Sequence, residues 1–195
     1  PRFSVDFNAP RILVRQIPSK SIYAVEAVYT DSDVINDLNS MIITDIKVNP
    51  LYLLGVLNSR LISLWFFMRY DKFQRRLFPQ FKVNELGEFP IPNSTKEQQD
   101  SIAILVEQLM DEMKKETPDS ELINKLNIEI DNLVMDLFDL TEDEKKIVSE
   151  FSDGLILENL QKVQSDNQIK TSDKLEGKFN LTIEMETGVG KTYTY

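Results

Sequence analysis

The residues that most clearly suggest chemistry lie near the C-terminus, where a predicted strand over residues 179–186 runs into the sequence TGVGKT. A glycine-rich turn in this position can point backbone N–H groups at phosphates, while the lysine reaches the terminal phosphates and the threonine hydroxyl meets magnesium. Met185 stands where the usual pattern has its first glycine, and the chain ends three residues after Thr192. A phosphate loop also needs the helix behind it, so the alternative is a severed edge of an ATPase. The candidate nucleotide-binding residues are Gly188, Gly190, Lys191 and Thr192.

Acid–base and thiol chemistry are restricted by composition, because the chain contains neither histidine nor cysteine. Imidazole bases, Ser-His triads, disulfides and thiolate metal sites are therefore excluded. Asp119, Glu144 and Lys146 have the residue types of a metal-dependent nuclease, but the two carboxylates fall at predicted helix starts, where acidic residues favour the helix dipole. We therefore predict no catalytic residues and no metal site in this chain.

A second catalytic pattern is only partly present. Asn49-Pro50-Leu51-Tyr52 resembles the Asn-Pro-Pro-Tyr motif with which adenine methyltransferases hold a flipped base. Leu51 replaces the second proline, and an asparagine followed by proline is typical of a helix start. No glycine-rich strand end suited to S-adenosylmethionine accompanies it, so we interpret the segment as a helix cap.

The net charge of −10 is unevenly divided. Residues 1–92 carry 11 Lys and Arg against 9 Asp and Glu, whereas residues 93–195 carry 11 against 23. Only the first half has the electrostatics to approach phosphate. The acidic half is expected to face solvent or protein. The densest cationic cluster comprises Arg69, Lys72, Arg75, Arg76 and Lys82.

The first half of the chain is predicted to position this cluster on an antiparallel set of strands and one long helix. The strand segments are residues 11–17, 22–30 and 33–43, which are rich in β-forming residues. Asn49 is predicted to cap a helix that runs to about Tyr70 with one apolar face. Residues 71–92 have few periodic signals and are typical of an irregular functional loop.

The second half is predicted to be helical. Thr95 with Gln98 forms a capping box, and two apolar stripes separated by Pro118 predict an antiparallel helical hairpin. Thr141 with Glu144 opens a further short helix into Phe151, and another is expected over residues 155–163. The predicted fold class is α+β: a small, mostly antiparallel β recognition core with one long buried helix, followed by the hairpin. The predicted divisions are 1–92 recognition core, 93–163 helices, 164–178 linker and 179–195 phosphate-loop-like segment.

Composition indicates a soluble globular chain, with 42% hydrophobic and 28% charged residues. No stretch has the length and apolarity of a membrane span, and no signal peptide opens the chain. Together with the lack of cysteine, this favours a cytoplasmic location. The chain begins at Pro1 directly before strand-like sequence, and we expect it to be a piece of a longer protein.

Several blocks in order resemble a known family. APRILVRQIPSKSIYAVEAVY, VINDLNSMIIT, YLLGVLNSRLISLWF and RRLFPQFKVNELGEFPIP, within residues 8–150, resemble the TaqI-like C-terminal specificity domain. That domain is the target-recognition part of type IIG restriction enzymes and related N6-adenine DNA methyltransferases. The hairpin ending LFDLTEDEKKIV is similar to the segment on the C-terminal side of the domain in that family. Separately, residues 179–195 resemble the first helicase motif of the restriction subunit of type III restriction enzymes, with Val189 in place of a threonine.

The first resemblance implies sequence-specific recognition of double-stranded DNA in a bacterial restriction–modification protein. Arginine and glutamine suit guanine and adenine edges in the major groove, and a flexible basic stretch suits phosphates. Alternatives stay open, because Arg15 could instead pair with Asp31 or Glu26, and Asn36 could be a turn residue. The candidate DNA-binding residues are Arg15, Gln16, Asn36, Lys72, Gln74, Arg75, Arg76 and Lys82.

The expected partners are duplex DNA and a linked or associated methyltransferase or nuclease domain, with no membrane. S-adenosylmethionine and magnesium are implied only for those other domains. Two other classes of function remain open: a helical protein-interaction scaffold that binds through the acidic half, and a truncated fragment of an ATP-dependent restriction translocase. Weak DNA affinity of the isolated chain is also expected, because a methyltransferase domain would normally hold the other side of the duplex.

Overall fold

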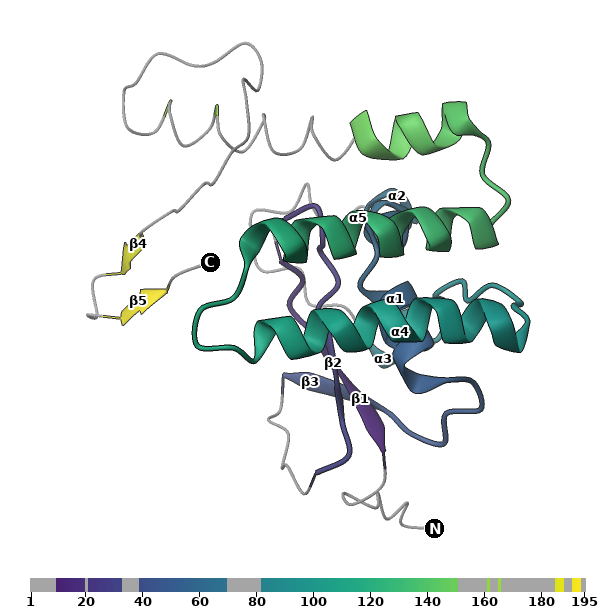
Figure 1. The fold of residues 1–195 in the computed structure, drawn as a ribbon. Helices are drawn as coiled ribbons and strands as arrows, with labels where there is room; N and C mark the ends of the chain where they lie inside the picture. Colours follow the sequence, from purple (N-terminus) through teal and green to yellow (C-terminus); the bar gives the residue numbers. More distant parts are fainter. Residues whose placement is uncertain are drawn as a thin grey trace. The chain divides into compact units, whose positions relative to one another are not determined.

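The structure, a computed structural model, has the predicted α+β fold class (Figure 1). The chain divides into two compact units, residues 1–156 and 157–195. The residues that the structure describes are 10–19, 21–32, 39–69, 82–150, 161, 165, 185–187 and 191–193.

A three-stranded antiparallel sheet forms one layer of the first unit. β1 (Arg11–Arg15) is central and lies between β2 (Ala27–Thr30) and β3 (Ser40–Ile43). The antiparallel arrangement is as predicted, but the strands are shorter than expected. Residues 16–17 and 22–26 are not strand, and 33–38 lie outside the described residues.

The sheet has one buried face and one partly exposed face, because side chains alternate along each strand. Ile12 and Val14 of β1 are fully buried, and their neighbours in register, such as Met41, lie on the same face. Leu13 and Arg15 point the other way. The strand pattern RILVR thus already fixes which face of β1 enters the core.

The single long helix predicted from Pro50 to about Tyr70 is two helices instead. α1 (Pro50–Leu57) and α2 (Arg60–Arg69) meet at a bend of 55°. At the break, the Ser59 hydroxyl accepts a hydrogen bond from the Ile62 N–H at 3.3 Å, as an N-cap residue does. The Asn58 amide turns outward to bond the backbone of Ala27. The prediction of one helix was wrong because these two polar residues find partners outside the helix ladder.

The predicted helical hairpin is confirmed as α4 (Lys96–Met113) and α5 (Ser120–Leu137). Its starts carry the expected caps: the Thr95 and Gln98 side chains bond each other's backbone N–H, and Asp119 caps α5. Residues 142–150 are helical, and the Thr141–Glu144 capping box at their start is also confirmed.

Helix α1 lies between the sheet and the hairpin and is buried along most of its length (Figure 1). A helix that is apolar all round needs such a position. At Gly55 the approach of α4 is close: a Cβ there would lie 2.8 Å from Ile102 Cγ2 and 2.9 Å from Val106 Cγ2. Glycine is therefore required by packing at this point.

One hydrophobic core runs through the sheet, α1, α2 and the hairpin. It includes Ile12 and Met41 from the sheet, Tyr52 from α1, and Ile102 and Ile130 from the hairpin. Residues on both sides of position 92 contribute to this core, and the predicted divisions stay a prediction.

The connection from α2 to the hairpin holds a short helix that the sequence did not predict, α3 (Val83–Leu86). Its start is held by the Glu85 carboxylate, which accepts the Lys82 backbone N–H at 2.7 Å. Four residues carry too little periodicity to be recognised as a helix.

In the second unit, β4 (Met185–Thr187) pairs with β5 (Lys191–Tyr193) as an antiparallel hairpin. The helix predicted over 155–163 and the linker 164–178 lie outside the described residues, apart from residues 161 and 165, which are helical.

Across the described ranges, no single helix is long and apolar enough to cross a membrane. Only α1 and α2 taken together, despite their bend, reach that length and composition. Their buried residues belong to the core.

Candidate nucleic-acid interface

The outer face of the sheet presents an apolar row across all three strands. Val28, Leu13 and Ile42 occupy paired positions in register, so their side chains share one face. Val28 is 54% exposed, and the other two are half-buried. Such a row suits apolar contact with a flat surface such as the edges or methyl groups of bases.

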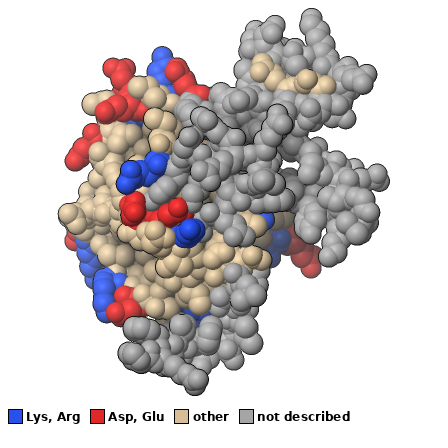
Figure 2. Space-filling view, turned by 180° about the vertical axis from the view of Figure 1, so that it is seen from behind, with Lys and Arg blue, Asp and Glu red and all other residues tan. Residues whose placement is uncertain are grey.

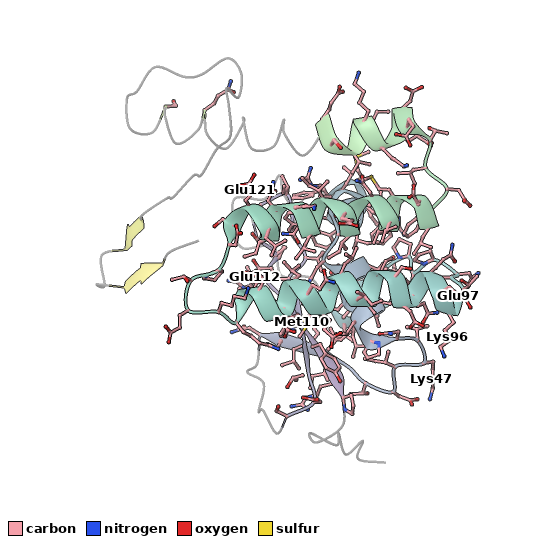
Figure 3. The ribbon with its side chains drawn as sticks, in the orientation of Figure 1. Lys47, Lys96, Glu97, Met110, Glu112 and Glu121 are labelled. Atoms are coloured by element: carbon pink, nitrogen blue, oxygen red, sulfur yellow. The ribbon has the colours of Figure 1, made fainter. Side chains whose placement is uncertain are left out.

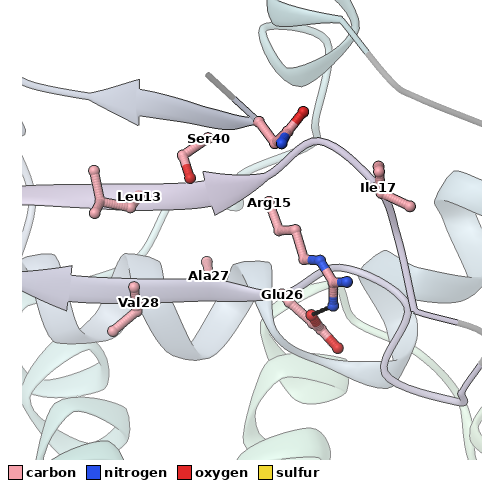
Figure 4. A pocket seen from close by; sticks show the side chains of 8 residues that line it. Leu13, Arg15, Ile17, Glu26, Ala27, Val28 and Ser40 are labelled. Atoms are coloured by element: carbon pink, nitrogen blue, oxygen red, sulfur yellow. Dashed lines mark hydrogen bonds and ion pairs between the residues drawn. The ribbon is translucent and has the colours of Figure 1, made fainter. Parts of the chain in front are cut away.

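Polar groups lie at the β1 C-terminal end of this row, and together they line a shallow hollow of about 520 Å³ (Figure 4). Arg15 stands beside Ser40, its partner in register, and Glu26 comes from the residue before β2. Asn39 and Ile17 complete this end of the hollow. The hollow thus combines an apolar floor with one guanidinium and one carboxylate.

Arg15 pairs with Glu26, one of the two alternatives to DNA contact left open by the sequence. The Arg15 Nη1 lies 2.6 Å from Glu26 Oε2, and the side chains remain 48% and 42% exposed. Exposed ion pairs of this kind contribute only about 0–1 kcal/mol to stability. Both partners of the pair line the hollow.

Gln16 lies next to Arg15, just beyond the end of β1. Its backbone N–H donates to the Asn39 carbonyl at 2.8 Å, which extends the pairing of β1 with β3 by one residue. The Gln16 side chain is half-buried. Asn36 falls within residues 33–38 and lies outside the described residues.

The residues that flank the basic stretch 70–82 contact each other. Arg69 Nη2 at the end of α2 lies 3.3 Å from Glu88 Oε2, and the Trp65 ring meets the Phe89 ring edge-on at 5.4 Å between centroids. Lys82 is exposed at the start of α3. Residues on either side of the basic stretch, in α2 and just after α3, are therefore in contact with each other. The other candidate residues of the stretch, which lie outside the described residues, are Lys72, Gln74, Arg75 and Arg76.

One face of the molecule carries charges of both signs. On the face in Figure 2, lysines and arginines are interspersed with carboxylates and uncharged residues. Phosphate contact by Lys72, Gln74, Arg75, Arg76 and Lys82 stays a prediction from the sequence.

The residues that mimic catalytic motifs have structural roles. Asn49 Oδ1 accepts the backbone N–H of Leu51 at 3.0 Å and caps α1, as predicted. Asp119 and Glu144 cap the starts of α5 and of helix 142–150. Within the described ranges, no three acidic residues are close enough to hold a metal ion.

The phosphate-loop-like residues are arranged differently from a phosphate loop. Lys191 and Thr192 lie in strand β5, paired with β4, whereas a phosphate loop places them at the start of a helix. Gly188 and Gly190 lie outside the described residues. Nucleotide binding remains a prediction from the sequence alone.

The sequence did not reveal a buried polar cluster that joins the recognition half to the hairpin. Asp131 of α5 is 4% exposed and accepts hydrogen bonds from the Tyr23 hydroxyl at 2.8 Å and from the Arg60 backbone N–H at 2.9 Å. Arg60 Nε lies 3.1 Å from the same carboxylate. An aspartate at a core position of an amphipathic stripe was the available signal, because a buried carboxylate needs partners.

Comparison with known proteins gives one family match. Residues 5–91 match the model of the TaqI-like C-terminal specificity domain. The match covers the sheet, α1, α2 and α3, and it ends before the α4–α5 hairpin. No curated protein matches the chain.

Proposed function

We propose that this chain selects the duplex DNA sequence on which a linked or associated adenine methyltransferase or endonuclease domain acts. Residues 5–91 match the TaqI-like C-terminal specificity domain, which is a DNA target-specificity domain of restriction–modification proteins. The observation that carries the proposal is the family match over the segment that contains the sheet face and the basic stretch. The hairpin and the C-terminal unit lie outside the match.

The proposed mechanism is discrimination between base sequences. Arg15 can leave Glu26 to make a bidentate contact with guanine, and Gln16 can contact adenine, each contributing about 1–3 kcal/mol of discrimination. Lys72, Arg75, Arg76 and Lys82 are proposed to contact phosphates, with Gln74 beside them. Such contacts fix the register of the protein on the duplex and make binding fall with salt.

Bond making is assigned to the other domains. Among the described residues, no carboxylate cluster suits magnesium, and the glycines Gly55 and Gly87 lie in a helix and at a helix end rather than after a strand. These residues do not fit S-adenosylmethionine or a catalytic metal. We place both groups on the methyltransferase or nuclease domains, and the protein in the bacterial cytoplasm.

Fluorescence-anisotropy binding to 30-base-pair duplexes of random sequence, over a series of salt concentrations, tests this proposal. Wild-type protein should bind, and its affinity should fall linearly on a log–log plot against salt. The double variant Arg75→Ala/Arg76→Ala removes two phosphate contacts and should reduce the slope of that plot by about 1.8.

A matched control is Lys96→Ala/Lys125→Ala, which changes net charge equally but alters two exposed lysines of the hairpin, outside the family match. This control should leave the slope unchanged. Equal losses in both double variants would mean that net charge alone governs binding. Absence of binding at low salt and high protein concentration would overturn the proposal in favour of a protein-interaction scaffold.

A further inference from the structure

Building on the proposed function, we infer that Asp131, in the hairpin beyond the family match, is a positioning residue for DNA reading. Through Tyr23 and Arg60 it fixes residues 21–26 of the β1–β2 connection, which end at Glu26, the partner of Arg15. The DNA-reading unit would then extend to α5. A hairpin of the acidic half thus contributes to recognition without contacting DNA.

Both oxygens of the Asp131 carboxylate have partners. Oδ1 accepts the backbone N–H of Arg60 at 2.9 Å, which caps the start of α2. Oδ2 accepts the Tyr23 hydroxyl at 2.8 Å and pairs with Arg60 Nε at 3.1 Å. Three parts of the chain, the β1–β2 connection, the α1–α2 break and α5, therefore meet at one buried carboxylate.

Tyr23 is the residue through which this cluster holds the connection. Its ring lies under the Arg60 guanidinium, with 5.6 Å from Cζ to the ring centroid. Burial raises the pKa of the Tyr23 phenol above its ordinary value, with the Asp131 charge adding to the shift, so the hydroxyl remains a donor to Asp131. Burial also raises the pKa of Asp131, while its hydrogen bonds to Arg60 and Tyr23 oppose the shift.

The backbone after Tyr23 is held by two further side chains of the α1–α2 region. The Ser63 hydroxyl accepts the Ala24 N–H at 3.0 Å. The Asn58 amide accepts the Ala27 N–H at 2.8 Å and donates to the Ala27 carbonyl at 3.0 Å. Because these contacts flank Glu26, the position of its carboxylate depends on the same framework.

The segment held by Asp131 is joined directly to Arg15 through Glu26. The Arg15 N–H donates to the Glu26 carbonyl at 2.9 Å, and the Arg15 guanidinium pairs with the Glu26 carboxylate. A shift of the β1–β2 connection therefore moves the Glu26 carbonyl and carboxylate, which hold Arg15 in position. Base readout requires a fixed geometry, whereas phosphate contact by flexible side chains tolerates small displacements. Loosening the cluster should thus reduce sequence preference more than overall affinity.

Two conservative variants test this role in the full chain. Tyr23→Phe removes only the hydroxyl that bonds Asp131, and Asp131→Asn keeps the shape but removes the charge that pairs with Arg60. Tyr29→Phe, at a half-buried tyrosine of β2, removes the same atom elsewhere. Glu129→Gln, at an exposed position of α5, removes the same charge from the same helix.

Selection from a pool of 30-base-pair duplexes with a randomised centre, followed by sequencing, identifies the preferred sequence of the wild type. Affinities for that sequence and for a scrambled duplex then give a preference ratio for each variant. We expect Tyr23→Phe and Asp131→Asn to reduce this ratio about tenfold, the scale of one bidentate base contact, with less than about twofold change on the scrambled duplex. Amide hydrogen exchange should accelerate in residues 19–27 of both variants, and the two controls should match wild type.

The other outcomes distinguish failure of the Asp131 role from failure of the proposed function. Equal losses on both duplexes, or faster exchange throughout the core, would assign Asp131 a purely structural role and overturn the inference. Wild-type binding with an unchanged preference ratio in both variants would overturn the positioning role but leave the proposed function intact. Absence of any DNA binding by the wild type would overturn the proposed function, and this role with it.

Discussion

The three-stranded sheet and the α4–α5 hairpin pack on the same helix α1, yet they present different chemistry to the outside. The outer face of the sheet carries an apolar row with Arg15 and Glu26 at its end. The hairpin helices carry nine Asp and Glu against two Lys. Figure 3 shows carboxylates at both ends of the hairpin, Glu97 at one end and Glu112 with Glu121 at the other.

This difference in charge suits the two regions to different roles around one core. A duplex with one negative charge about every 1.7 Å would be repelled by the hairpin, whereas the sheet side and the basic stretch can approach it. The hairpin contributes instead through buried contacts, at Gly55 and at Asp131. On the proposed function, the acidic hairpin would serve DNA recognition by packing rather than by contact with DNA.

The largest effect is expected from Gly55→Val, which would separate α1 from the hairpin. Its side chain would clash with Ile102 and Val106, because even a Cβ at position 55 would lie 2.8 and 2.9 Å from their Cγ2 atoms. Both residues are β-branched and lie in a helix, where one χ1 rotamer is strongly preferred. Overpacking of this kind costs up to about 3 kcal/mol of unfolding free energy. Urea unfolding measures the loss. Gly87→Ala is the control, since a Cβ there is 3.4 Å from its nearest neighbour, and a comparable loss in both variants would contradict the packing argument.

A somewhat smaller effect is expected at the contact between α1 and the sheet. Asn58→Ala leaves the Ala27 N–H and C=O at the edge of β2 without their side-chain partner. Unsatisfied groups of this kind cost about 1–3 kcal/mol, and we expect about 2 because the site is only partly buried. Urea unfolding again provides the measurement, with hydrogen exchange at Ala27 as a local readout. Unchanged exchange at Ala27 would argue against the proposed edge contact.

Two variants, Arg15→Ala and Glu26→Ala, test whether the outer face of the sheet contacts DNA. If Arg15 reads a base, its loss should reduce the preference for the selected duplex by about 1 kcal/mol or more. Glu26→Ala should have the opposite effect on affinity, strengthening binding to scrambled duplexes, because a carboxylate facing DNA is removed. Anisotropy titrations on selected and scrambled duplexes distinguish the two. Identical effects of both variants would indicate that the ion pair only stabilises the fold.

The smallest effect is expected in the pH dependence of the hairpin. Hydrogen bonds from Lys115 Nζ and the Asp119 backbone N–H lower the pKa of Glu112 below its ordinary value of 4.5. Because the pKa of Glu112 is lower in the folded state, its contribution to folding stability is present above pH 4.5. This contribution is lost as the pH falls through the folded-state pKa. Thermal unfolding from about pH 7 to about pH 3 should show this acid loss in wild type and less of it in Glu112→Gln.

The contribution of Asp131 to folding stability should change with pH in the opposite direction to that of Glu112. Its raised pKa means that the contribution is largest below the ordinary aspartate value of 3.8 and declines as the pH rises through the folded pKa. Asp131→Asn should therefore make the acid loss of stability steeper, not shallower. A shallower loss in Asp131→Asn would show that attraction to Arg60 outweighs burial.

The sequence by itself determined the parts of this protein that depend on near neighbours. The caps at Asn49, Thr95 and Thr141 act within three residues, the buried face of β1 follows from alternation, and the amphipathic stripes define the hairpin. The family resemblance, confirmed over residues 5–91, likewise rests on ordered local blocks. Local rules suffice wherever both partners of an interaction are close in the chain.

Only the tertiary structure decided the features whose partners are distant. The break at Asn58 depends on Ala27, 31 residues away, and the burial of Asp131 depends on Tyr23, 108 residues away. Arg15 had two carboxylate partners open to it, and the register of β1 with β2 selected Glu26. Periodicity reports which side of a helix or strand is buried, but not against what. A polar residue that breaks a helix or enters a core is explained only by the partner that the fold brings to it.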